Sequence, residues 1–297
     1  MSQFGWVDSP RDVEAFLSTL SEPMFARAAA PIADSGKGKA VLLHKNLEKV
    51  LGKFPIHNQT IGDCVSHGWS LCIDVLKATE IVAGEAESFN AETATEAIYA
   101  LSRVEIGGGR LGNEDGSLGA WAADAVKKYG TLARIKYGNY DLTTYDGQRA
   151  KAWGGARKGL PDELEPIAKE HPVTTVSLVT TYEQARDAIA NGYPVPVCSM
   201  QGFAETRDAD GFAAPKGTWP HCMAFIAVDD AYKRPGLLCM NSWGPDWIRG
   251  PKRNDQPDGS FWVDADVVNR MLAQRDSFAI SGFQGYPARK LPETWLS

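Results

Sequence analysis

The spacing of apolar residues changes near residue 172 of the chain. Up to about residue 135, apolar positions recur at the three- and four-residue spacing of helices, most clearly from Cys64 to Ala83. After residue 172, short runs rich in β-branched and aromatic residues are typical of strands. A helical first half and a strand-rich second half predict an α+β protein with two lobes. Ligand sites commonly lie in the cleft between such lobes.

The expected elements follow from this spacing and from helix-ending glycines such as Gly52, Gly130 and Gly192. Helices are expected at 10–20, 40–51, 64–83, 93–102, 118–129 and 182–191. Strands are expected at 173–179, 194–200, 222–229, 237–243, 260–263 and 277–283. Residues 21–39, rich in Ala, Pro, Gly and Lys, are predicted to be a linker.

The composition excludes several classes of function. The 297 residues carry a net charge of −6, which disfavours binding to nucleic acid or to an anionic membrane surface. The first eleven residues include Asp8 and Pro10, where a signal peptide has basic and apolar residues. Five cysteines in so long a chain argue against a disulfide scaffold. We therefore expect a reduced, cytoplasmic protein.

Cys64 is the first candidate for chemistry. It opens the long apolar helix, and a helix N-terminus favours a thiolate through its exposed N–H groups and its dipole. A helix end alone rarely ionises a thiol at pH 7, so an imidazolium is needed nearby. Cys64 and His67 have the spacing of half a metal site, but no second pair follows. We expect neither a metal nor a cofactor.

Two elements of the second half complete a pattern with Cys64. His221 lies at the head of an expected strand, in Pro-His-Cys-Met-Ala-Phe, and Asn241 ends the next one, in Asn-Ser-Trp-Gly-Pro-Asp-Trp. Asn58 and Gln59 place side-chain amides shortly before the cysteine. A thiol beside an imidazole that an amide orients is one of the arrangements used for nucleophilic catalysis.

With these motifs the chain resembles the papain-like cysteine peptidases. Their pattern is a glutamine, a glycine-containing turn, a cysteine at a helix start, a histidine heading a strand, and Asn-Ser-Trp-Gly. Residues 241–244 match the last element letter for letter. The resemblance covers roughly residues 50–290 and implies a helical N-terminal lobe, an antiparallel β-rich C-terminal lobe, and a site in the cleft between them.

The resemblance also implies roles for particular residues. Cys64 would be the nucleophile that forms an acyl-enzyme, and His221 its ion-pair partner and proton donor. Asn241 would orient His221, under the cover of Trp243.

Gln59 would form the oxyanion hole with the N–H of Cys64, although it lies one residue nearer the cysteine than the family's glutamine. Asn58 occupies the family's position and stays an alternative. Gly116 and Ser117 would pair with the backbone of a peptide substrate, and the loop 202–220 would form part of the rim of its pocket.

Residues 1–49 are predicted to be an N-terminal extension, 50–170 the helical lobe, 171–290 the β-rich lobe and 291–297 a tail. The extension could act as a lid, a docking arm or a segment removed by processing. The sequence resembles members encoded by bacteria and bacteriophages. The main alternative to a peptidase is thus a catalytically silent scaffold, for example a virion component with an assembly partner, in a virion or the host cytoplasm. Acyl transfer to an amine is a third interpretation.

Overall fold

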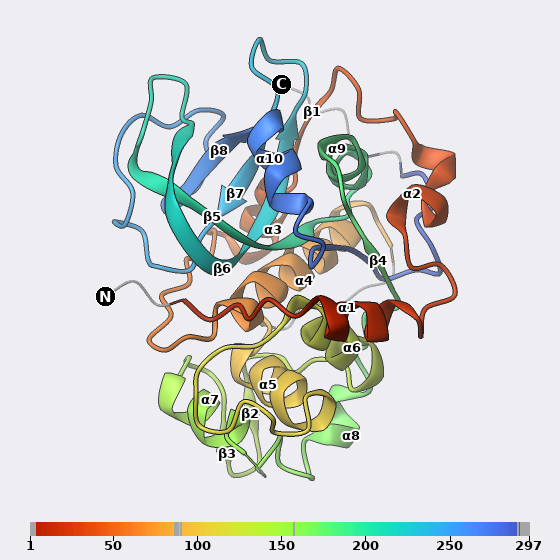
Figure 1. The fold of residues 1–297 in the computed structure, drawn as a ribbon, viewed down its shortest axis with the longest axis vertical. Helices are drawn as coiled ribbons and strands as arrows, with labels where there is room; N and C mark the ends of the chain where they lie inside the picture. The colour runs from red at the N-terminus through yellow and green to blue at the C-terminus, as the bar shows by residue number, and fades with distance from the viewer. Residues whose placement is uncertain (1–3, 86–88, 90, 157, 290, 292–297) are drawn as a thin grey trace.

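The computed structural model describes residues 4–85, 89, 91–156, 158–289 and 291. Figure 1 shows an upper part that contains the main sheet and a lower part built of helices, with one long helix running between them. The α-helices are α1 (Pro10–Leu17), α2 (Phe25–Ala28), α3 (His44–Leu51), α4 (Cys64–Val82), α5 (Thr95–Ala100), α6 (Gly119–Lys128), α7 (Gly147–Gly154), α8 (Glu165–Ala168), α9 (Tyr182–Ala190) and α10 (Ala265–Leu272). The strands are β1 (Ala40–Leu42), β2 (Lys136–Tyr137), β3 (Tyr140–Asp141), β4 (Thr175–Leu178), β5 (Val195–Arg207), β6 (Ala213–Asp229), β7 (Gly236–Met240), β8 (Ser260–Asp264) and β9 (Phe278–Ser281).

Helix α4 is the central element of the fold. Its first thirteen residues, Cys64–Leu76, are all buried, so it is enclosed on every side rather than on one face. The helix can approach strand β6 because residue 68 is a glycine. A Cβ atom at Gly68 would lie 2.9 Å from both the Cys222 Sγ and the Met223 carbonyl oxygen. This close packing brings the N-terminal turn of α4 against the middle of β6.

The main sheet is antiparallel and is built around β6. One edge of β6 pairs with β7, which in turn pairs with β8. The other edge pairs first with β5 and then with β1, whose Leu42 lies opposite Ala227. The β6–β7 register, with Ala224 opposite Met240, places His221 and Asn241 near each other, because each lies just beyond the paired segment. Strands β4 and β9 form a separate pair.

Helices α5, α6, α7 and α8 form the lower part, and a buried arginine holds the loop that faces α4. The guanidinium of Arg103 donates to the carbonyl oxygens of Gly154 (2.7 Å), Gly112 (3.0 Å), Glu114 and Gly116. Arg103 lies in a π-helix, η2 (Leu101–Ile106), which continues α5. One side chain therefore fixes the backbone of residues 112–116.

The α+β class and its two-part arrangement are confirmed, but three expectations about local structure are wrong. Residues 40–42 are a strand and not helix, because they pair with β6. Residues 202–220 are largely strand, because β5 and β6 continue into a long, bulged hairpin. Helices α7, α8 and α10 are not predicted from the sequence.

The predicted linker at 21–39 contains α2 and a 3₁₀ turn, Ala30–Ile32. The predicted tail at 291–297 lies outside the described residues apart from residue 291. In the part of the chain that the structure describes, no helix is long and apolar enough to span a membrane.

Replacing Arg103 with methionine is expected to destabilise the protein by about 3 kcal/mol, since buried carbonyls lose a charged donor while the side-chain volume is largely kept. Urea unfolding of the variant measures this loss. Arg27→Met is the control, because Arg27 is 82% exposed and pairs only at the surface with Glu22, so it should cost less than about 0.5 kcal/mol. Equal effects of the two variants would contradict the role assigned to Arg103.

Candidate active site

Cys64 is the first residue of α4, as the sequence predicts. The helix begins there because the Asp63 carbonyl accepts from the N–H groups of Ser66 (3.0 Å) and His67 (3.3 Å). The Asp63 carboxylate does not cap the helix, since it accepts from the Tyr145 hydroxyl instead. The Cys64 thiol is fully buried, and its sulfur accepts a hydrogen bond from the backbone N–H of Cys222 at 3.4 Å. The thiol thus lies against β6, at the residue that follows His221.

His221 and Asn241 are hydrogen-bonded to each other. The Nε2 atom of His221 lies 2.8 Å from the Oδ1 atom of Asn241. An amide oxygen only accepts, so Nε2 must carry a proton, and in the neutral imidazole Nδ1 then has a lone pair. Among the described residues Nδ1 has no hydrogen-bond partner, although it is buried. The tautomer that Asn241 selects is therefore the one that can accept a proton at Nδ1.

Aromatic side chains cover this pair. The ring of Trp243 lies 4.7 Å from that of His221, centroid to centroid, and contacts the rings of Trp219 and Trp247. The ring of Phe4 lies 5.7 Å from Trp243 and 6.1 Å from His221. Both His221 and Asn241 are buried beneath these rings.

The two candidate amides differ in their placement. Gln59 is buried, its Nε2 donates to the Ile61 carbonyl at 2.8 Å, and its Oε1 accepts from the Ser242 hydroxyl. Asn58 is exposed, and its side chain lies next to Gly244. Gln59 is therefore the amide that is fixed inside the site, beside the turn that leads into Cys64.

Ser117 pairs with residues 5 and 7 of the chain itself, whereas the Gly116 N–H donates to the Tyr99 hydroxyl at 3.2 Å and the Gly116 carbonyl accepts from Arg103. The N–H of Ser117 donates to the Gly5 carbonyl at 2.8 Å, and the Ser117 carbonyl accepts from the N–H of Val7 at 2.9 Å. The sequence predicts that both residues pair with an added strand, but it does not predict that residues 5 and 7 are the partners of Ser117. No local signal in residues 4–7 indicates this pairing.

In this enclosed site, the Cys64 thiol and the His221 imidazole are both favoured in their neutral forms. Burial is the main cause that raises the pKa of the Cys64 thiol. The N–H groups of Cys222 and Gly5 act in the opposite direction and lower it. Burial also lowers the pKa of His221 to about 4, although the hydrogen bond that His221 donates to Asn241 opposes this. A thiolate–imidazolium pair, which the sequence predicts, is disfavoured while water is kept out.

His67, which the sequence left unassigned, is buried beside the site. Its Nδ1 lies 3.1 Å from the Nδ1 of His57, and its Nε2 lies 3.5 Å from the Asp63 carboxylate. These contacts give His67 a structural partner on each side. In the described part of the chain, no group of three or more His, Cys, Asp or Glu side chains is placed to hold a metal ion.

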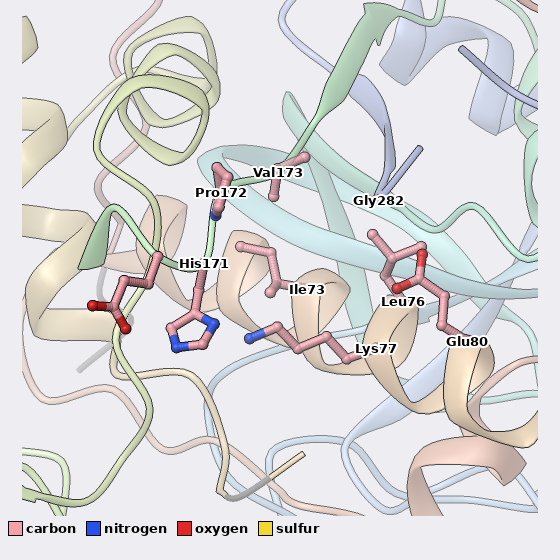
Figure 2. A pocket seen from close by; sticks show the side chains of 9 residues that line it. Ile73, Leu76, Lys77, Glu80, His171, Pro172, Val173 and Gly282 are labelled. Atoms are coloured by element: carbon pink, nitrogen blue, oxygen red, sulfur yellow. The ribbon is translucent and has the colours of Figure 1, made fainter. Parts of the chain in front are cut away.

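A separate cavity of about 200 Å³ lies beside the C-terminal half of α4 (Figure 2). Lys77 points toward the ring of His171 across it. Of the α4 residues that line this cavity, Ile73 is the one nearest to Cys64. It lies about 13 Å further along the helix axis, at a rise of 1.5 Å per residue. No cysteine, serine or threonine is among the described residues that line it, and it lies away from the His221–Asn241 pair, so it does not compete with Cys64 as the candidate site.

The low pKa of His221 makes stability depend on pH. The pKa of His221 is about 4 in the folded protein and 6.5 ordinarily. The contribution of neutral His221 to the free energy of unfolding is therefore complete above pH 6.5 and is lost as the pH falls toward 4. Between pH 7 and pH 5, His221→Gln should lose about 2 kcal/mol less unfolding free energy than the unchanged protein. Urea unfolding at both pH values measures the difference, and equal losses would contradict the assignment.

Comparison with known proteins identifies the fold. No protein-family model matches the sequence, and no curated protein matches it significantly. The structure is similar to that of xylellain, a cysteine protease from Xylella fastidiosa, at 16% identity and a TM-score of 0.55, over 94% of this chain and 91% of the other. It is also similar to procathepsin B from Trypanosoma congolense, at 12% identity and a TM-score of 0.51, over 93% and 89%. The chain therefore has the fold of the papain-like cysteine proteases.

Proposed function

We propose that the protein is a cysteine-type peptidase or amide hydrolase. The observation that carries the proposal is the arrangement of three residues. Cys64 opens a buried helix, its sulfur contacts the residue after His221, and His221 is held by Asn241 in the tautomer that accepts a proton. This combination supplies a nucleophile, a base and an orienting group.

The reaction begins when a peptide carbonyl is placed next to the thiol. The Nδ1 atom of His221 takes the proton of the Cys64 thiol, and the sulfur attacks the carbonyl carbon. The C–N bond then breaks as Nδ1–H gives its proton to the leaving amine. An acyl-enzyme is left, and a water that loses its proton to Nδ1 hydrolyses the thioester, which releases the acid and restores the thiol.

The negative charge that forms on the carbonyl oxygen needs N–H donors. We assign this role to the Gln59 carboxamide and the N–H of Cys64, at the positive end of the α4 dipole. The Gln59 Nε2 donates to the Ile61 carbonyl, which holds the carboxamide beside the turn that leads into Cys64. The Ser242 hydroxyl donates to Oε1 of Gln59, so the Nε2 end of the carboxamide faces the turn before Cys64.

Replacing Cys64 with alanine is expected to abolish hydrolysis of a denatured protein substrate such as casein. The matched control is Cys72→Ala, because Cys72 is buried in the same helix but is not beside His221, and its variant should stay active. The assay is run on the unchanged chain and in parallel on Gly5→Ala, since Gly5 lies against the Cys64 thiol. If neither hydrolyses casein although Cys64 is accessible to iodoacetamide, the peptidase proposal fails and the silent scaffold is favoured.

Replacing Gln59 with alanine is expected to lower kcat by a factor of about 10² to 10³ with little change in KM, since the lost donor acts on the transition state. Asn58→Ala is the control, because the neighbouring amide is exposed and should leave kcat within about twofold. Steady-state kinetics on a fluorogenic peptide measure both. The reverse order of effects would assign the oxyanion role to Asn58.

A further inference from the structure

Two histidines lie in a row between two carboxylates beside the candidate active site. The Nδ1 atoms of His57 and His67 are 3.1 Å apart. At the inner end of the row, Nε2 of His67 lies 3.5 Å from Oδ1 of Asp63, the residue before Cys64. At the outer end, Nε2 of His57 lies 3.8 Å from the Glu92 carboxylate. Four titratable side chains thus form a continuous row that ends next to the candidate nucleophile.

The row is buried at one end and open at the other. The side chains of Asp63 and His67 are 0% and 2% exposed, whereas that of Glu92 is 34% exposed. Water therefore reaches the row from the Glu92 end. At the buried end, neither Nε2 of His67 nor Oδ1 of Asp63 has a hydrogen-bond partner at ordinary distance among the described residues. Two such atoms that face each other satisfy each other only when a proton lies between them.

Counting protons fixes the direction of the hydrogen bonds along the row. A neutral imidazole has one N–H, so one histidine donates from Nδ1 and the other accepts there. The donor then turns a bare Nε2 toward its carboxylate, and the acceptor turns an N–H toward its own. A bare nitrogen against the fully buried Asp63 carboxylate is costly, whereas water can separate one from Glu92. His57 is therefore the donor, and the Nε2–H of His67 points to Asp63.

Further titratable and charged groups face the row from the elements packed against it. They are Arg134 and Tyr145 from the helical part, and His221 and Cys222 from β6. The Tyr145 hydroxyl donates to Oδ2 of Asp63 at 2.9 Å, so Oδ1 is the oxygen left for His67. Burial lowers the pKa of His57, and the charges of His67 and Arg134 act in the same direction. An extra proton is therefore not held on the imidazoles but passes along the row.

We infer that this row is a proton wire that sets the charge of Asp63, the carboxyl next to Cys64. A proton from water at Glu92 binds Nε2 of His57, and the Nδ1 proton of His57 moves to Nδ1 of His67. The Nε2 proton of His67 moves to Oδ1 of Asp63. One proton enters the row and one arrives at its end. Every hydrogen bond then points the other way, from Asp63 toward Glu92, so the row is hydrogen-bonded in both states.

The charge of Asp63 matters for the proposed function, on which this role of the wire rests. Asp63 is one of the groups that raise the pKa of the Cys64 thiol. Protonation of Asp63 removes that contribution, so the thiol gives up its proton more easily. His57 and His67 act on Cys64 only through Asp63, and they are therefore positioning residues.

Nitrogen-15 NMR of the unchanged full chain, labelled in its histidines, tests the wire independently of hydrolysis. At about pH 8 we expect protons on Nδ1 of His57 and Nε2 of His67, with a scalar coupling between the two Nδ1 atoms across their hydrogen bond. Toward about pH 5 the protons should move to Nε2 of His57 and Nδ1 of His67, while both rings stay neutral. An imidazolium on either ring, unchanged tautomers, or no coupling would overturn the inference.

The pH profile of Cys64 alkylation by iodoacetamide, located by mass spectrometry, measures the effect on the thiol. His67→Phe breaks the wire and leaves Asp63 charged, so the midpoint of the profile should rise by about half a pH unit or more. Asp63→Asn removes the charge, so adding His67→Phe to it should shift the midpoint no further. The matched control is His44→Phe, because His44 is fully buried in α3 but lies outside the row.

The two proposals fail in different ways. An equal midpoint in His67→Phe and the unchanged chain, or the same shift in His44→Phe, would overturn the role assigned to the wire. A further shift on adding His67→Phe to Asp63→Asn would also do so, because the effect would then not pass through Asp63. If the tautomers and the midpoints change as expected but no peptide is hydrolysed, the wire stands and only the peptidase proposal fails.

Discussion

The close contact between helix α4 and strand β6 determines where everything else in the site can lie. Gly68 has no side chain, so the helix backbone approaches Cys222 and Met223 closely. Since Cys64 lies one turn earlier on the helix and His221 precedes Cys222 on the strand, one packing contact sets the positions of both. Asn241 follows from the register of β6 with β7. Cys64, His221 and Asn241 therefore lie close together because the backbones of α4 and β6 pack with no side chain between them at Gly68.

The enclosure of the site has an electrostatic consequence. A thiolate and an imidazolium attract each other, but burial penalises each charged form before any attraction is counted. Here burial raises the pKa of Cys64 and lowers that of His221, so the closed site holds a thiol and a neutral imidazole. Admission of water would reduce both penalties.

The sequence predicts those parts of the fold that depend on local spacing. The start of α4 at Cys64 and the strands around His221 and Asn241 could be predicted, because periodicity and end signals act over a few residues. Strand β1 could not, because residues 40–42 become a strand only by pairing with β6, far along the chain. The choice between Gln59 and Asn58 as the oxyanion donor likewise depends on which of the two side chains is buried. A shift of one residue in the turn would exchange them.

The segment formed by residues 4–7 shows most clearly what local sequence leaves out. Phe4-Gly5-Trp6-Val7 carries no periodic pattern, and its glycine is useful only because the Gly62 carbonyl lies opposite it. Its tryptophan finds Asp276 at the other end of the chain, and that carboxylate also caps α6. The side chain that holds the segment in place is therefore the one that starts a framework helix.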